Sequence, residues 1–226
     1  MQLIERTFRW AGGGVFVAAL GFCAYTFVAR WSLDAPVDRS AVWFDVVLFS
    51  IFAMHHSVLA RQPVKRVIAR LVPERLLRSV YVWIASLLLM SVCALWRAVG
   101  GGLYEVTGWP SALHAAVQLA GLAIITGAVR KIDALELAGI QEHTREQPLQ
   151  IDGPYRLVRH PIYLGWLLAT FGAAHLTGDR LVFAVVSGIY LVVAMPIEER
   201  ALRREFGDTY EQYAKHVRWR VVPYIY

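Results

Sequence analysis

The stretch 152-DGPYRLVRHPIYLG-165 organises the rest of this chain. Gly153 and Pro154 are a turn signal, and an apolar run begins at Ile162. Aromatic, cationic and imidazole side chains are crowded around this junction: Tyr155, Arg156, Arg159, His160 and Tyr163. Pro161 fits the first turn of a helix, where its missing N–H costs nothing. The pattern therefore predicts a dense polar cluster where a loop enters an apolar helix.

This polar cluster has two interpretations. One is a basic juxtamembrane anchor with aromatic residues at the membrane interface. The other is a site for an anionic group, because the free N–H groups and the dipole of the first helical turn favour negative charge. A second cluster, Glu198-Glu199-Arg200, follows the next apolar run, and a helical hairpin would return it to the side of Arg159 and His160. That pairing favours the functional interpretation.

The motifs, taken in this order, resemble the signature of the isoprenylcysteine carboxyl methyltransferase-like membrane enzymes. The resemblance covers about the last third of the chain and rests on Gly153-Pro154-Tyr155, Arg159-His160-Pro161-x-Tyr163-x-Gly165, Glu198-Glu199 and Phe206-Gly207-x-x-Tyr210-x-x-Tyr213. The stretch 52-FAMHHSVLARQPVKRVIARLVPERLLRSVYV-82 is similar to the methanethiol S-methyltransferase branch and to the related NnrU-type membrane proteins. That branch has Gln where His55 stands and an acidic residue where Leu77 stands.

The resemblance implies S-adenosylmethionine as the cofactor, bound at the membrane face. It places the cofactor on Tyr155, Arg159, His160, Pro161, Tyr163, Gly165, Glu198 and Glu199. The two glutamates suit the ammonium or ribose hydroxyls of the cofactor, and the arginine, the histidine and the helix N-terminus suit its carboxylate. The two tyrosine rings suit the adenine or the sulfonium. No glycine fingerprint follows a predicted strand, so a soluble dinucleotide-type fold is not expected.

Composition indicates a membrane protein. The 226 residues are 57% hydrophobic and have a mean hydropathy of +0.46, whereas soluble domains of this size are usually less apolar. Apolar runs predict about six transmembrane helices, near 10–28, 42–60, 79–96, 112–129, 162–177 and 181–197. Apolar residues recur every three or four positions in 199–217, which predicts a C-terminal amphipathic helix. The predicted fold class is all-α and polytopic, as one domain over 1–226, with N-terminal helices in 1–130 and a cofactor-binding catalytic core in 131–226.

The charges agree with a membrane setting. The formal net charge is +6, but the basic residues fall mainly between apolar runs, so we expect the lipid bilayer and no nucleic acid as a partner. Lys and Arg residues in the loops after the second and fourth runs and in the tail predict that both termini are cytoplasmic, in a bacterial inner membrane. Cys23 and Cys93 lie within apolar runs and form neither a disulfide framework nor a metal motif.

Candidates for acceptor chemistry are His55 and His56, together with Arg159 and His160. Ionisable groups within an apolar run are a functional sign. Adjacent histidines on a helix point about 100° apart, so we expect no metal there. A small thiol, with a pKa near 8.5, must lose its proton, and His160, His55 or His56 could take it.

The resemblance of both halves to the methanethiol S-methyltransferase branch implies S-methylation of a small or lipophilic thiol. A prenylcysteine carboxylate is already ionised and needs no base, so carboxyl O-methylation stays open, as does phospholipid N-methylation. A different class, a non-catalytic or transport-like membrane protein of the NnrU type, also stays open. The pairing of Glu198-Glu199 with Arg159-His160 argues against that class, because transport has no evident need for it.

Overall fold

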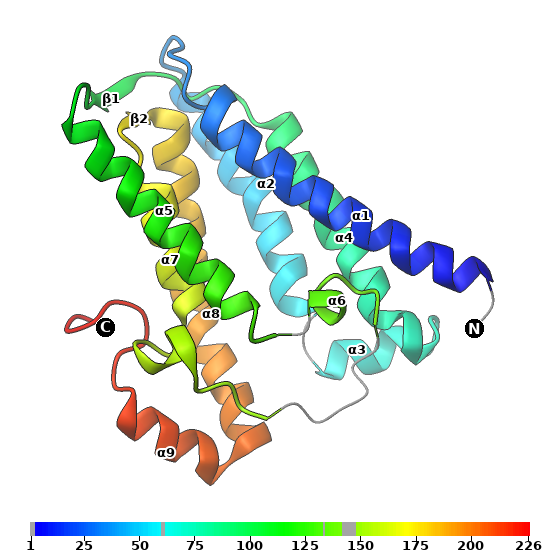
Figure 1. Ribbon diagram of the computed structural model, residues 1–226. Coiled ribbons are helices and arrows are strands. Elements are labelled where there is room, and N and C mark those ends of the chain that lie inside the picture. The colour runs from blue at the N-terminus through cyan, green and yellow to red at the C-terminus, as the bar shows by residue number, and fades with distance from the viewer. Residues whose placement is uncertain (1–2, 60–61, 133, 142–147) are drawn as a thin grey trace. The chain divides into compact units, whose positions relative to one another are not determined.

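The computed structural model describes residues 3–59, 62–132, 134–141 and 148–226, and it consists mainly of helices (Figure 1). Five of these helices are long and apolar enough to cross a membrane: α1 (Leu3–Tyr25) with its π-helical continuation η1 (Thr26–Arg30), α2 (Arg39–Val58), α4 (Glu74–Leu95), α5 (Pro110–Val129) and α8 (Gly178–Phe206). Each has at least the roughly 20 residues that a bilayer demands. The predicted all-α membrane protein is confirmed. The predicted end of the second run, at Ala60, lies outside the described residues.

The shorter elements connect these helices. They are α3 (Gln62–Ile68), β1 (Gly102–Glu105), α6 (Ala134–Leu137), the 3₁₀ helix η2 (Gly153–Arg156), α7 (Pro161–Phe171), β2 (His175–Thr177) and α9 (Asp208–His216). The two strands pair in a small sheet. Among the described residues they are the β-structure of an otherwise helical chain.

The predicted fifth span differs from the structure. The apolar run 162–177 was expected to be one helix, but α7 has 11 residues and ends at Phe171. Gly172 follows the helix and donates its N–H to the carbonyl oxygen of Leu168 at 3.0 Å, and the chain then enters β2. An 11-residue helix is about half the length of a span, so the count of six spans is not confirmed.

The predicted amphipathic helix over 199–217 is divided into two. α8 continues through Pro196 to Phe206, and Gly207 then takes a φ of +51°, which is open to glycine and strained for other residues. After this break α9 begins at Asp208 and buries Tyr210 and Tyr213.

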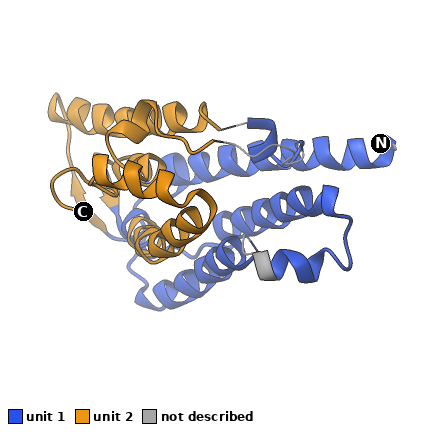
Figure 2. Ribbon diagram, turned by 90° about the horizontal axis from the view of Figure 1, so that it is seen from below, with its two compact units in different colours: residues 1–101, 133–145, 177–182 blue, residues 102–132, 146–176, 183–226 orange. Residues whose placement is uncertain are grey.

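The chain forms two compact units, coloured separately in Figure 2. The first consists of residues 1–101, 133–145 and 177–182. Within it α1 packs against α4: Trp83 donates its indole N–H to the carbonyl oxygen of Phe8 at 3.1 Å, and Arg9 donates to that of Arg75 at 2.7 Å. The buried carboxylate of Asp179 accepts from the indole of Trp96 at 2.9 Å, which fixes the start of α8 in this unit.

The second unit consists of residues 102–132, 146–176 and 183–226. Its centre is the contact of α5 with α7, where Gly121 faces Gly165. A β-carbon on either glycine would lie 2.5 Å from the carbonyl oxygen of the other, so the two backbones touch only because neither residue has a side chain. This contact fixes the direction of α7, whose first turn carries the central motif.

Candidate active site

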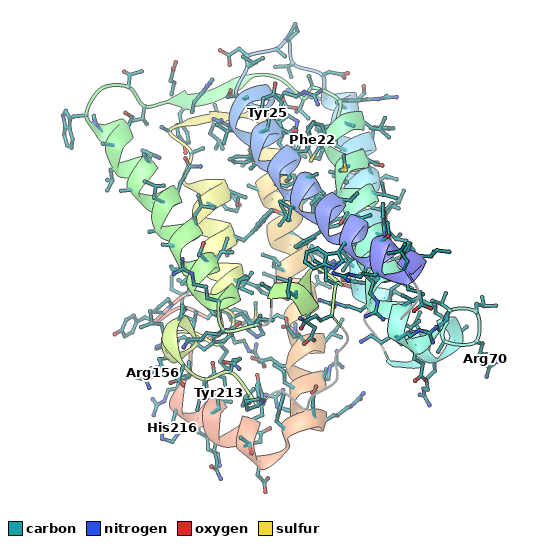
Figure 3. The ribbon with its side chains drawn as sticks, turned by 45° about the vertical axis from the view of Figure 1, so that its right-hand side comes forward. Phe22, Tyr25, Arg70, Arg156, Tyr213 and His216 are labelled. Atoms are coloured by element: carbon teal, nitrogen blue, oxygen red, sulfur yellow. The ribbon has the colours of Figure 1, made fainter. Side chains whose placement is uncertain are left out.

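The central motif is fixed to the C-terminal tail by its backbone. The N–H of Arg159 donates to the carbonyl oxygen of Trp219 at 2.9 Å, and that of His160 donates to the carbonyl oxygen of Arg220 at 2.8 Å. On the other side the hydroxyl of Tyr213 donates to the carbonyl oxygen of Tyr155 at 2.8 Å. Figure 3 shows Tyr213 on α9, with Arg156 of η2 nearby. The turn before α7 is therefore held between α9 and the tail.

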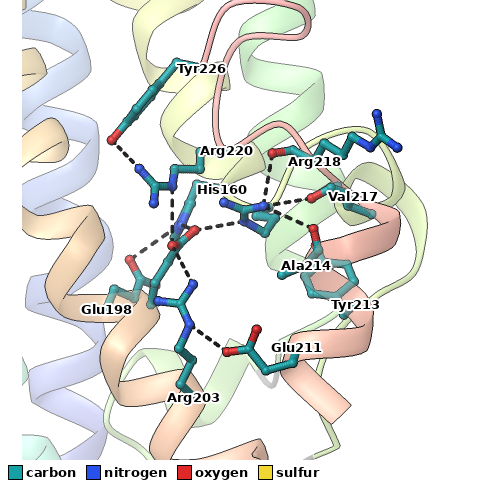
Figure 4. Close-up of polar contacts among 12 residues, drawn as sticks. His160, Glu198, Arg203, Glu211, Tyr213, Ala214, Val217, Arg218, Arg220 and Tyr226 are labelled. Atoms are coloured by element: carbon teal, nitrogen blue, oxygen red, sulfur yellow. Dashed lines mark hydrogen bonds and ion pairs between the residues drawn. The ribbon is translucent and has the colours of Figure 1, made fainter. Parts of the chain in front are cut away.

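Glu199 is the centre of the polar cluster, and its side chain is fully buried. Its Oε1 lies 2.8 Å from Nε of Arg159 and 3.4 Å from Nε2 of His160. Its Oε2 lies 3.3 Å from Nε of Arg220 and 3.6 Å from Nη2 of Arg203 (Figure 4). A buried carboxylate is tolerated only when opposite charges and hydrogen bonds replace its lost hydration, and three guanidinium groups do so here.

Arg159 links Glu199 to the end of α9. Its Nη1 donates to the carbonyl oxygens of Val217 at 2.9 Å and Arg218 at 3.0 Å. These oxygens lie just past the last turn of α9, where a cation is favoured by the helix dipole and by the unsatisfied carbonyls. The side chain of Arg159 is only 9% exposed, so most of its donor capacity serves the protein itself.

Glu198 is the exposed member of the glutamate pair. Its side chain is 48% exposed, and its Oε2 accepts a hydrogen bond of 2.6 Å from the hydroxyl of Tyr163. Nδ1 of His160 lies 3.6 Å from the same oxygen, and the imidazole stacks on the Tyr163 ring at 5.1 Å. The His160 ring thus lies between the two carboxylates, with one nitrogen toward each.

Two buried tyrosines, Tyr210 and Tyr213, and the partly buried Tyr155 surround the cluster. Burial raises the pKa of Tyr210 to about 12, and the negative charge of Glu199 acts in the same direction. Burial also raises the pKa of Tyr213 and of Tyr155, and for Tyr155 the charge of Glu198 adds to the effect. All three side chains are therefore neutral hydroxyls at physiological pH.

Several buried polar atoms of this cluster have no hydrogen-bond partner within the part of the chain that the structure describes. They are Nε2 of His160, Oε2 of Glu199 and the hydroxyl of Tyr210. Two of them still face charged groups: Nε2 of His160 lies 3.4 Å from Oε1 of Glu199, and Oε2 of Glu199 lies 3.3 Å from Nε of Arg220. At these two atoms, ion-pair contacts take the place of hydrogen bonds.

The structure brings together most of the residues predicted from the sequence. Arg159, His160, Glu198 and Glu199 meet as the helical hairpin predicted, and Tyr163 joins them through Glu198. The remaining residues predicted to bind the cofactor make backbone and packing contacts between elements. Tyr155 offers its carbonyl oxygen to α9, Pro161 is buried at the first position of α7, and Gly165 touches α5.

His55 and His56 belong to the other unit, in α2. The His56 Nδ1 lies 2.8 Å from the hydroxyl of Tyr81, and the His55 ring stacks on the Tyr81 ring at 5.5 Å. Both ring nitrogens of His55 are buried and have no partner among the described residues. Over the same residues, no group of three or more His, Cys, Asp or Glu side chains is arranged to hold a metal ion.

Sequence reasoning missed two arginines of the cluster. Arg203 follows Glu199 by four positions, and that helical spacing was a usable signal. Arg220 had no local signal, because it reaches Glu199 through the backbone pairing of the tail with the start of α7.

Known proteins resemble this chain over most of its length. A family model described as phospholipid methyltransferase matches residues 132–209. The chain is 34% identical over 213 residues to methanethiol S-methyltransferase 2 of Bradyrhizobium diazoefficiens, covering 89% of this chain and 82% of that protein. It is also 34% identical to the methanethiol S-methyltransferases of Crocosphaera subtropica, covering 92% of this chain and 86% of that protein, and of Mycobacterium tuberculosis, covering 89% and 87%. No solved structure matches.

These matches confirm the resemblance seen in the motifs, and with it the expectation of an enzyme rather than a non-catalytic membrane protein. The family model matches the hairpin that carries Arg159, His160, Glu198 and Glu199. The similarity to these relatives extends to the N-terminal helices. The chain belongs to the family of integral membrane methyltransferases that includes the methanethiol S-methyltransferases.

Proposed function

We propose that this chain transfers the methyl group of S-adenosylmethionine to a small or lipophilic thiol. The observation that carries the proposal is the cluster in which His160 lies between the exposed carboxylate of Glu198 and the buried carboxylate of Glu199. The thiol is supported by the relatives, whose names give methanethiol as the molecule that they methylate.

The residues of the cluster fit the chemistry of this cofactor. Its ammonium and ribose hydroxyls need acceptors, and Glu198 offers a carboxylate that is half-exposed. Its adenine can stack on an aromatic ring, and its sulfonium is attracted to the face of one. Tyr163 and His160 supply a stacked pair of rings. Pro161 and Gly165 support the site by setting the direction of α7.

Within the cluster we assign different work to the two glutamates. Glu198 contacts the cofactor, whereas Glu199 positions His160, Arg159 and the tail. Arg159 is a positioning residue as well, since its guanidinium donates to Glu199 through Nε and to the carbonyl oxygen of Val217 through Nη1. Tyr163 holds the Glu198 carboxylate in place through its hydroxyl.

The chemistry is a displacement at carbon. When bound, S-adenosylmethionine supplies an electrophilic methyl group on a sulfonium. The chain must align the acceptor sulfur, exclude water and receive the thiol proton. We assign proton removal or stabilisation of the thiolate to His160, His55 or His56. The bound donor would give its methyl group to the acceptor sulfur and would leave as the neutral thioether S-adenosylhomocysteine.

We further propose that the chain lies in a bacterial inner membrane with both termini in the cytoplasm. The support is the Lys and Arg residues of the loops after α2 and α5 and of the tail. A reporter that is active only in the periplasm, fused after Tyr226, is expected to stay inactive. Activity of that fusion would contradict this topology.

The decisive test uses the purified protein in detergent. Calorimetry with S-adenosylmethionine is expected to give saturable binding, and incubation with methanethiol to give dimethyl sulfide detectable by gas chromatography. A prenylcysteine and phosphatidylethanolamine serve as competing acceptors. Preferred methylation of the prenylcysteine carboxylate would move the chain to O-methylation, and preferred methylation of the lipid amine to N-methylation. Binding of no cofactor would overturn the proposal.

A further inference from the structure

Arg220 holds a distinctive place in the cluster. It lies in the tail beyond α9, and its carbonyl oxygen accepts the N–H of His160 at 2.8 Å. Its guanidinium is fixed at two points: Nε lies 3.3 Å from Oε2 of Glu199, and Nη1 donates to the hydroxyl of Tyr226 at 2.6 Å. The guanidinium also lies over the Tyr226 ring, 5.0 Å from its centre. The side chain is thus oriented before any ligand arrives.

The other two arginines around Glu199 are bonded to α9 or to its end. Arg159 is 9% exposed and is bonded to the carbonyl oxygen of Val217. Arg203 is 39% exposed and is bonded to Glu211 of α9 at 2.9 Å. Arg220 is 31% exposed, and its guanidinium contacts Glu199 and Tyr226. Of the three, Arg220 is therefore the partly exposed guanidinium whose contacts in the described part of the chain lie outside α9.

Arg220 and Glu198 form a complementary pair across His160. Figure 4 shows the Arg220 guanidinium above the Glu198 carboxylate, on the side of the cluster away from α9. Each is partly exposed, and each contacts His160: Glu198 lies near Nδ1 of the imidazole, and the carbonyl oxygen of Arg220 accepts the main-chain N–H. A cation and an anion held in this way match a zwitterion, in which a carboxylate and an ammonium share one carbon.

We propose that Arg220 binds the carboxylate of the α-amino acid group of the methyl donor, while Glu198 binds its ammonium. This inference rests on the function proposed above and adds a ligand-binding residue from outside the central motif. A guanidinium offers two parallel N–H groups to a carboxylate, and a charge-assisted pair of this kind is both strong and directional. Arg220 of the tail then makes the site specific for a donor with an intact amino acid group.

The test compares two ligands in the wild type and three variants by calorimetry. The ligands are S-adenosylhomocysteine and its decarboxylated analogue, which differ only in the carboxylate. The wild type is expected to bind the first about 10- to 100-fold more tightly, the usual effect of one charge-assisted hydrogen bond. Arg220→Gln is expected to lose this preference, so that both dissociation constants become similar, while the constant for the decarboxylated analogue changes little.

Arg203→Gln is the matched control, because it also removes a guanidinium that faces Glu199. It is expected to keep the wild-type ratio between the two ligands. Arg220→Lys keeps the charge and is expected to restore part of the preference. Thermal melting of each variant checks that it folds.

The outcomes separate this inference from the function on which it rests. If Arg220→Gln weakened the affinity for both ligands equally, Arg220 would be a positioning residue for Glu199 and the inference would be overturned. An unchanged ratio of the two dissociation constants would overturn it as well. In either case the wild type would still bind the cofactor, and the proposed function would stand. A wild type that binds neither ligand would overturn both.

Discussion

Arg159 and Glu199 are forty positions apart in the chain, and their Nε and Oε1 atoms lie 2.8 Å from each other. Both side chains are almost fully removed from solvent. Because neither charge is hydrated, each is stabilised by the opposite charge of its partner. This dependence distinguishes Glu199 from its neighbour Glu198, whose carboxylate is half-exposed.

The first prediction uses that distinction. Glu199→Gln leaves buried guanidinium charge without its counterion, and removal of one partner of a buried pair costs about 3–5 kcal/mol. We expect a large fall in melting temperature in detergent. Glu198→Gln is the matched control: it should melt close to the wild type but bind S-adenosylmethionine more weakly, by calorimetry. Equal melting temperatures for the two variants would contradict the structural role of Glu199.

The second prediction concerns the contact of α5 with α7. Gly165→Ala places a methyl group 2.5 Å from the carbonyl oxygen of Gly121, so the helices must separate. Overpacking of this kind costs about 1–3 kcal/mol, and the melting temperature should fall. Gly14→Ala in α1 meets no atom within 4 Å and should melt at or above the wild-type temperature. A Gly165→Ala protein as stable as Gly14→Ala would show that the contact is loose.

The third prediction concerns alkaline pH. The pKa of Tyr210 is about 12 in the folded protein, whereas an exposed tyrosine titrates near 10. The folded state therefore holds this proton more tightly, and its contribution to stability is complete below pH 10 and falls as pH rises toward 12. Melting temperatures measured from pH 9 to pH 11 should decline, and Tyr210→Phe should decline less steeply. Parallel curves for the two proteins would mean that other groups cause the decline.

The fourth prediction concerns the acceptor. His55→Ala and His56→Ala should lower the turnover of methanethiol and leave the affinity for S-adenosylmethionine nearly intact, the pattern for a group that acts on substrate or transition state. Tyr81→Phe is the control for packing, because it keeps the ring beside both histidines and removes the hydroxyl next to His56. Full turnover in both alanine variants would reduce the histidines to packing residues.

Sequence patterns predicted the site better than they predicted the ends of helices. The hairpin could be expected because an apolar run separates His160 from Glu198, and the division at Gly207 follows from its backbone freedom. The early end of α7 at Phe171 was missed because the prediction followed the apolar run through 177, and hydrophobicity alone does not say where a helix stops. Gly172, which follows Phe171, was a usable stop signal.

The place of Arg220 was hidden for a different reason. Its approach to Glu199 depends on two main-chain hydrogen bonds, from the N–H groups of Arg159 and His160 to the tail. Long-range pairing of this kind leaves no periodicity in the sequence. Arg203, in contrast, is one helical turn from Glu199 and could be placed from spacing alone.

Arg159 and His160 donate hydrogen bonds to main-chain carbonyl oxygens of the tail. The acceptors are those of Val217, Arg218, Trp219 and Arg220. A carbonyl oxygen is present at every position of every protein, so this recognition does not depend on which side chains stand at 217–219. Substitutions at 217–219 would thus leave these hydrogen bonds in place as long as the path of the backbone is kept. A search by motif would find Arg159 and His160 and pass over the segment that holds them in place.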